Sequence, residues 1–186
     1  MTTPYGAGGA QAGGPADGAP GRAVRPGVRV GVDVGSARVG VAASDPTGTF
    51  AHPVRTLARD EQHQSDLAEL EALVDELGAV EVVVGLPLLL SGLEGAAAQT
   101  ARAYAVALAA RTGTVTVRLV DERLTTVDAH RRLRDSGVPG RGQRKVVDQA
   151  AAVLILQTAL DTEASSGRPP GESVTTGGRR KKERRR

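Results

Sequence analysis

The sequence predicts an α/β fold in which helices cover both faces of a mixed five-stranded sheet. Three short apolar segments separated by turn residues come first, between residues 28 and 57, and this pattern is typical of an antiparallel meander. From residue 65 onward, helical and strand patterns alternate, which is typical of parallel strands joined by crossover helices. Together the two patterns predict three antiparallel strands followed by parallel ones.

The opening meander has clear strand and turn signals. In VRVGVDV, valine at every second position makes one face apolar, whereas Arg29, Gly31 and Asp33 lie on the other face. The dipeptide GS and the tetrapeptide DPTG supply the two turns. The three expected strands are 28–34, 38–44 and 49–57.

The later elements are expected from hydrophobic periodicity. Leucine and valine at three- and four-residue spacing predict a first helix that ends at Gly78. The apolar segment VEVVVGLP is typical of a strand covered on both faces. The expected elements are a helix at 65–77, a strand at 80–87, a helix at 94–111, a strand at 114–120, a helix at 125–135 and, after a loop at 136–144, a last helix at 145–160.

Composition sets the expected limits of the ordered domain. Glycine, alanine and proline dominate residues 1–27, and residues 163–186 have the same character and end in GGRRKKERRR. Such segments bury little apolar surface, so we expect two disordered tails around one ordered domain at 28–162. That domain holds 14 basic and 17 acidic residues, so the chain's net charge of +3 comes from the tails.

Composition also excludes several classes of protein. Without cysteine there is no disulfide framework and no thiolate metal site. No apolar run reaches transmembrane length and the N-terminal residues do not form a secretory signal, so we expect a cytoplasmic protein without membrane contact. The chain has only three aromatic residues, which argues against a reader of single strands that stacks bases on aromatic rings.

Three acidic residues stand where strands end or a helix begins: Asp33, Glu122 and Asp148. If the strands at 28–34 and 114–120 are neighbours, the first two carboxylates meet at one edge of the sheet, and the last helix adds the third. Ligands that offer only oxygen suit Mg²⁺ or Mn²⁺ rather than Zn²⁺. Such an ion activates water and stabilises the leaving oxygen in an in-line phosphoryl displacement.

Each of these residues also has a purely structural interpretation. Asp33 fits a turn-forming residue in a D-x-G sequence. Asp148 fits a first-turn carboxylate that the helix dipole favours. Asp121 and Glu122 fit solvated charges at the end of a strand, and Asp121 is the better candidate for a structural role.

Four segments resemble, in order and spacing, the YqgF family, also called RuvX-like, a branch of the ribonuclease H-like fold related to Holliday-junction resolvases. These segments are GVDVGSARVGVAAS, VVVGLPLLLSGLEGAAA, LVDERLTTVDA and KVVDQAAAVLILQ. The resemblance covers the expected domain and neither tail. DERLTT followed by KVVD is its most specific part, since actin-like ATPases share the D-x-G motif.

The resemblance implies that Asp33, Glu122 and Asp148 form a catalytic triad that binds Mg²⁺ or Mn²⁺. It implies a nuclease that hydrolyses phosphodiester bonds and processes the 5′ end of pre-16S rRNA in ribosome biogenesis. The expected partner is therefore pre-rRNA, with branched DNA as the alternative. The chain departs from the family at Leu88-Leu89-Leu90, where a polar residue often follows GLP.

Basic residues cluster in sequence between the second and third acidic motifs. Because the domain is otherwise acidic, a phosphate backbone would be bound here. The alternative is that Arg131, Arg132 and Arg134 only solvate a helix face and that Thr125 only caps a helix. The candidates for substrate binding are Arg38, Arg123, Thr125, Arg144 and Lys145.

Other functions fit parts of the sequence. One is a DNA nuclease like the Holliday-junction resolvases, and another is a non-catalytic RNA-binding factor in ribosome assembly or transcription. A lobe of an actin-like ATPase or sugar kinase would require two such domains, and the expected domain supplies one. The sequence is compatible with either a monomer or a homodimer.

Overall fold

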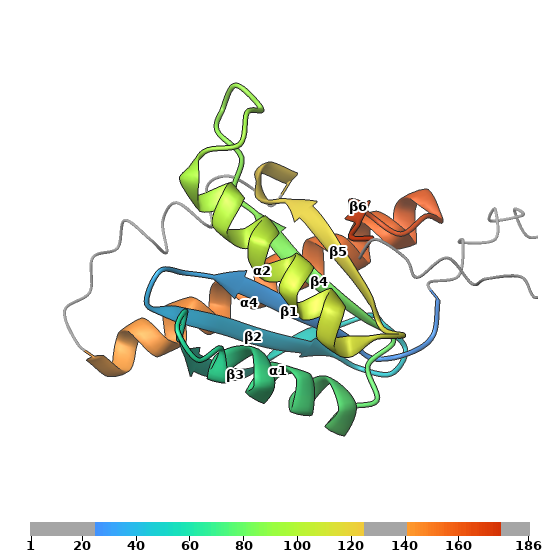
Figure 1. Cartoon of the computed structure of the whole chain (residues 1–186). Helices are drawn as coiled ribbons and strands as arrows, with labels where there is room; N and C mark the ends of the chain where they lie inside the picture. Colours follow the sequence, from blue (N-terminus) through green and yellow to red (C-terminus); the bar gives the residue numbers. More distant parts are fainter. Residues whose placement is uncertain (1–24, 125–140, 176–186) are drawn as a thin grey trace, which may run out of the picture.

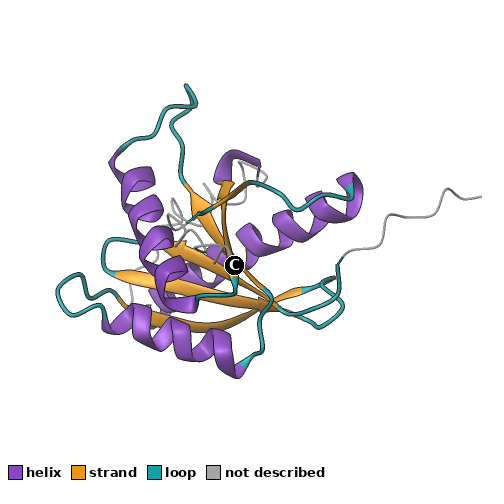
Figure 2. Ribbon diagram, turned by 45° about the vertical axis from the view of Figure 1, so that its right-hand side comes forward, coloured by secondary structure: helices purple, strands orange, loops and turns teal. Residues whose placement is uncertain are grey.

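The computed structural model describes residues 25–124 and 141–175 of the chain. Helices α1 and α2 lie on one face of a single sheet, and α4 lies on the other (Figures 1 and 2). The elements are β1 (Arg29–Val34), β2 (Arg38–Ser44), β3 (Ala51–Ala58), α1 (Ser65–Glu76), β4 (Glu81–Leu86), α2 (Ala96–Thr112), β5 (Thr116–Asp121), the 3₁₀ turn η1 (Glu122–Leu124), α4 (Arg141–Ser166) and β6 (Glu172–Ser173).

The sheet confirms the predicted α/β class and adds a strand to it. Its strand order is β3-β2-β1-β4-β5-β6. Strands β1, β2 and β3 form the predicted antiparallel meander, and β4 and β5 run parallel to β1. The sixth strand, β6, is antiparallel to β5, so the expected count of five is corrected to six. A strand of two residues is too short to show a periodic pattern in sequence.

Residues 25–27 and 163–175, which composition assigned to the tails, have defined structure. Helix α4 extends to Ser166 and begins at Arg141, four residues before the expected start. The expected helix at 125–135 and the outer parts of both tails lie outside the described residues. In residues 25–124 and 141–175, no helix combines the length and apolar character needed to cross a membrane.

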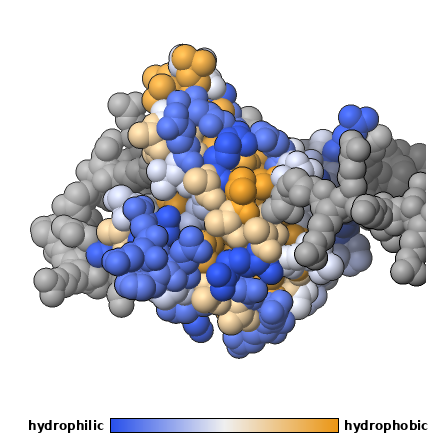
Figure 3. All heavy atoms as spheres, in the orientation of Figure 1, coloured by the Kyte–Doolittle hydropathy of each residue, from blue (hydrophilic) through white to orange (hydrophobic). Residues whose placement is uncertain are grey.

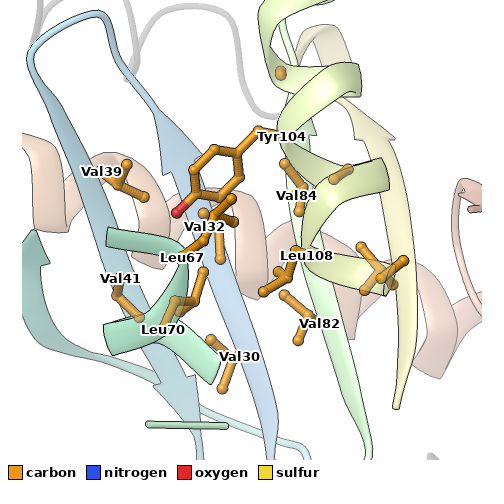
Figure 4. Close-up of a cluster of buried hydrophobic side chains, with 14 of the residues drawn as sticks. Val30, Val32, Val39, Val41, Leu67, Leu70, Val82, Val84, Tyr104 and Leu108 are labelled. Atoms are coloured by element: carbon orange, nitrogen blue, oxygen red, sulfur yellow. The ribbon is translucent and has the colours of Figure 1, made fainter. Parts of the chain in front are cut away.

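The alternating valines of β1 divide the core into two parts. Val30 and Val32 face α1 and α2, where they join Leu70 and Leu108 in the larger apolar cluster (Figure 4). The intervening residue, Gly31, faces α4, because a Cβ atom at this position would lie 2.6 Å from Cβ of Leu156. The side of β1 that carries glycine is therefore the side on which α4 packs closely.

Helix α4 also approaches β2 at a glycine. A Cβ atom on Gly40 would overlap the backbone carbonyl of Asp148 in α4. Glycine inside a strand often marks such a close approach of another backbone. This contact holds the first part of α4 directly over β1 and β2.

Buried charges join the sheet to the C-terminal half of α4. Arg29, Glu81 and Glu163 are only 1%, 1% and 3% exposed. Arg25 Nε lies 2.7 Å from Glu163 Oε1, and Arg25 Nη2 lies 3.0 Å from Glu81 Oε1. Arg118 Nε lies 2.9 Å from Glu81 Oε2. Buried carboxylates need such partners because desolvation of an unpaired charge is costly.

We expect Glu163→Gln to lower the free energy of unfolding by about 3 kcal/mol at neutral pH, because Arg29 then loses a buried counter-charge. The hydrogen bond from Arg25 lowers the pKa of Glu163 below its ordinary value of 4.5. A lowered pKa contributes stability that is fully present above the unfolded-state pKa and disappears as the pH falls through the folded-state pKa. The difference between the two proteins should therefore shrink below about pH 4 in urea denaturation.

Glu172→Gln is the matched control. Glu172 also pairs with an arginine, Arg102, but its side chain is 60% exposed. We expect this substitution to lower the free energy of unfolding by less than about 1 kcal/mol. Equal losses for the two variants would show that the buried network does not hold α4 to the sheet.

We expect Gly40→Ala to lower the free energy of unfolding by about 3 kcal/mol, because the added methyl group overlaps the backbone of α4. Gly113→Ala is the control, since no atom lies within 4 Å of its added Cβ and its φ is 63°. In that control the free energy of unfolding should fall by only about 1 kcal/mol, because alanine is disfavoured in a left-handed backbone conformation. Equal urea midpoints for the two variants would contradict the close approach of α4.

Candidate active site

The candidate site lies at the edge of the sheet where the parallel strands β1, β4 and β5 end. Asp33 is the last but one residue of β1. Glu122 follows β5 directly and opens the η1 turn. Asp148 lies on α4, in the part of the helix that crosses β2. All three belong to the side of the sheet that α4 covers.

Asp33 and Asp148 are brought together by the contact between β2 and α4. Asp33 is the cross-strand partner of Gly40 in the antiparallel β1–β2 pair, so both residues face the same side. The backbone of Asp148 occupies the space directly over Gly40. Asp148 therefore lies over the strand next to Asp33.

Glu122 reaches the same region across β4. The condition that the strands at 28–34 and 114–120 are neighbours is not met, because β4 lies between β1 and β5. The Glu122 carboxylate lies over β4 at Gly85, where a Cβ atom would lie 2.6 Å from Glu122 Oε1. The β1–β4 register ends at the pair Val32 and Val84, so Gly85 stands at the level of Asp33. The Glu122 carboxylate thus lies over the strand beside Asp33.

A basic residue adjoins the third carboxylate. Arg38 Nη1 lies 3.5 Å from Asp148 Oδ2, and the two side chains are 30% and 29% exposed. Arg38 begins β2, directly after the turn that follows β1. A partly exposed guanidinium at this point adds positive charge at the rim of an acidic site.

Asp121 and Glu122 have different surroundings. The guanidinium of Arg123 contacts both carboxylate oxygens of Asp121, with Nη2 2.6 Å from Oδ2, and its backbone N–H donates to Oδ1. These hydrogen bonds lower the pKa of Asp121. Asp121 and Arg123 therefore form a local ion pair, and Glu122 is the residue that lies over Gly85.

The candidates for substrate binding are described to different extents. Arg38 is at the site, and Arg123 lies beside it but is engaged by Asp121. Thr125 lies outside the described residues, and for Arg144 and Lys145 only the backbone, in the first turns of α4, is described.

The donor set of the site is chemically suited to a hard cation. Asp33, Glu122 and Asp148 offer carboxylate oxygen only, the ligand type that Mg²⁺ and Mn²⁺ take. In the ranges 25–124 and 141–175, no three carboxylate or histidine side chains stand at the spacing of a metal cluster. The three acidic residues thus share one face and one edge of the sheet, without a formed metal cage.

Sequence reasoning missed the two glycines that make the site compact. Gly40 and Gly85 lie inside strands, and each leaves room for a site residue or its backbone. The signal that could have found them is glycine at a strand interior, which marks a close approach. It also missed the shape of the segment between β4 and α2, where Leu90 is 92% exposed.

Comparison with known proteins supports the relation expected from the motifs. The family model described as RuvX, Holliday junction resolvase, matches residues 27–162. A protein of Kineococcus radiotolerans named "Putative pre-16S rRNA nuclease" is 55% identical over 159 residues, which are 85% of this chain and 84% of that protein. A protein of Nocardioides sp. with the same name is 55% identical over 153 residues, 81% of this chain and 98% of that protein.

A solved structure confirms the fold. T. thermophilus RuvC in complex with a Holliday junction substrate matches with a TM-score of 0.50 and 14% identity, covering 79% of this chain and 99% of that chain. The ribonuclease H-like architecture expected from the motifs is therefore confirmed. With the family model matching most of the chain, this protein belongs to the RuvX family.

Proposed function

We propose that the protein is a metal-dependent nuclease that hydrolyses phosphodiester bonds at the 5′ end of pre-16S rRNA during ribosome biogenesis, in the cytoplasm. The observation that carries the proposal is the placement of Asp33, Glu122 and Asp148 on one face and one edge of the sheet. The names of the relatives at 55% identity support the same activity.

The three carboxylates would hold Mg²⁺ or Mn²⁺. When bound, such a cation lowers the pKa of an attacking water and stabilises charge on the phosphate oxygens. Asp33 comes from β1, which lies inside the sheet between β2 and β4. Glu122 follows β5 without an intervening glycine, so the direction of its backbone is set by the strand.

Arg38 is proposed to orient the phosphate. Its guanidinium lies at the rim of the site beside Asp148 and is partly exposed, so it can donate to a phosphate oxygen without leaving the site. Arg123 is proposed to act mainly through Asp121, by holding the start of the η1 turn and thus the position of Glu122.

A second candidate is a junction-cleaving DNA nuclease. It is favoured by the description of the matching family model and by the fold shared with RuvC. Both candidates use the same carboxylates, so the substrate decides between them. Cleavage of a 5′ pre-16S rRNA fragment but not of a four-way DNA junction would support the first, and the reverse result would support the second.

Asp33→Asn, Glu122→Gln and Asp148→Asn should each reduce Mn²⁺-dependent cleavage by about a thousandfold or more while the protein remains folded. Each variant loses one charged oxygen ligand, so Mn²⁺ should raise the melting temperature of the parent protein and should raise that of the variants much less. Cleavage is measured with end-labelled RNA and folding by circular dichroism.

Asp75→Asn is the matched control for this set, because Asp75 is an exposed carboxylate on α1. It should retain both cleavage and the stabilisation by Mn²⁺. Undiminished cleavage by all three site variants would refute the proposed triad.

We expect Arg38→Ala to weaken RNA binding and to reduce the slope of log affinity against log salt by about one, because one phosphate contact is lost. Arg111→Ala is the control, since Arg111 pairs with Glu71 on the helix α1. Binding is measured by fluorescence anisotropy at several salt concentrations. An unchanged slope in Arg38→Ala would mean that Arg38 only neutralises Asp148.

A further inference from the structure

The segment between β4 and α2, residues 87–95, projects beyond the sheet and carries exposed leucines. Figures 1 and 2 show it as a long loop that rises above the ends of β4 and β5. The exposed fractions of Leu89, Leu90 and Leu93 are 52%, 92% and 67%. In Figure 3 the same projecting tip forms an apolar cap over polar atoms. We refer to these three side chains as the leucine tip.

The loop that carries the leucine tip has internal hydrogen bonds that define its shape. The N–H of Leu89 donates to the carbonyl of Leu93 at 3.0 Å, and the N–H of Gly92 donates to the carbonyl of Leu89 at 2.8 Å. Leu88 and Glu94 form an antiparallel bridge at its base. Gly92 adopts a left-handed φ of 85°, which closes the turn. The tip is thus a small hairpin that presents leucine to solvent.

The hairpin is connected to the candidate active site through Arg123. Arg123 Nη1 lies 3.5 Å from the carbonyl oxygen of Leu90. The same guanidinium holds Asp121, the residue before Glu122. The leucine tip therefore stands next to the strand end that carries a site carboxylate, and its position is linked to that residue.

In the described ranges, neither the tyrosine nor the phenylalanine is placed to stack on a base at this site. Tyr104 is 2% exposed and belongs to the core (Figure 4). Phe50 is 71% exposed but precedes β3, whose first residue pairs with the last residue of β2, at the edge of the sheet away from the site. Proteins that bind nucleic acid also use aliphatic side chains, including leucine, as wedges that enter between base steps and unstack them.

We propose that Leu90 and Leu93 form an apolar wedge that inserts between bases of the nucleic-acid substrate beside the bond to be cut. The inference rests on the proposed function, because it requires a nucleic acid in the site. A base step offers two apolar faces at a distance that a single aliphatic side chain can enter once the step opens. The wedge would separate the bases that flank the phosphate while Arg38 contacts the backbone.

A second copy of this chain is the less favoured occupant of the leucine tip. A stable interface buries roughly 800 Å² on each partner, far more than three side chains at the end of a hairpin can supply. On the face that Figure 3 shows, polar atoms lie directly below the tip, which also argues against a larger apolar interface there.

The test measures base unstacking in a protein that binds without cutting. Single 2-aminopurine substitutions are placed at successive positions of a 5′ pre-16S rRNA fragment, and fluorescence is recorded with Asp148→Asn protein. We expect a rise of about twofold or more at one or two adjacent positions. Adding Leu90→Ala and Leu93→Ala to Asp148→Asn should remove most of the rise at saturating protein, whereas adding Phe50→Ala should leave it unchanged.

A cleavage assay supplies the second readout, with Asp148 intact. Leu90→Ala together with Leu93→Ala should reduce cleavage of a base-paired fragment by about tenfold, and should change cleavage of a fragment with mismatches at the same step by less than about twofold. The leucines are exposed, so their loss should leave the melting temperature unchanged.

The outcomes separate the wedge from the proposed function. A fluorescence rise that persists without the leucines, or no rise at any position, overturns the wedge even if the parent protein cleaves RNA. A dimer seen by sedimentation that dissociates in the leucine variant, with the fluorescence rise intact, overturns it in favour of a second copy. Failure of the parent to cut any fragment refutes the nuclease, whereas a leucine-dependent rise would still support the wedge.

Discussion

Helix α4 lies against β1 and β2 at a distance that only glycine in the strands allows. The backbone of Asp148 occupies the space where a side chain at Gly40 would stand, and Leu156 occupies the space beside Gly31. This contact helps to decide where the third carboxylate lies relative to Asp33, because the two residues are far apart in sequence. A larger residue at these positions would lift the helix and open the site. The geometry of the candidate site therefore depends on the absence of two side chains as much as on the presence of three carboxylates.

The two ends of the sheet differ in character: buried ion pairs lie at one end, and the candidate active site lies at the other. At one end, Arg29, Glu81 and Glu163 are almost fully buried and pair with one another and with Arg25 and Arg118. Buried ion pairs of this kind tolerate little movement, because separating the charges leaves them without water or partners. At the other end, the acidic side chains are partly exposed and their basic neighbours lie at the surface. Anchoring α4 at the buried end leaves the other end accessible to a substrate while its backbone stays in place.

The surroundings of the site match a polyanionic substrate in two ways. The partly exposed Arg38 beside Asp148 and Arg123 beside Asp121 reduce the net negative charge that a phosphate backbone would meet at this edge. The leucine tip offers apolar side chains for contact with the bases of such a substrate, in a protein that has few aromatic residues. Arg123 links the two, since it contacts both Asp121 and the carbonyl oxygen of Leu90. A single guanidinium thus positions the hairpin and the turn that begins with Glu122.

The sequence by itself determined strands β1 to β5, helices α1, α2 and α4, and the candidate acids. Valine alternation in β1, helical spacing in α1 and the motifs around Asp33, Glu122 and Asp148 are local patterns, and local patterns are readable because strand and helix repeat with fixed periods. Only the tertiary structure decided that β4 separates β1 from β5 and that Gly85 leaves room for Glu122 to lie over β4. The sixth strand, formed by Glu172 and Ser173, was also decided only there. It also decided which of Asp121 and Glu122 is engaged by Arg123. These features arise from contacts between residues distant in the chain, whose register no local period records.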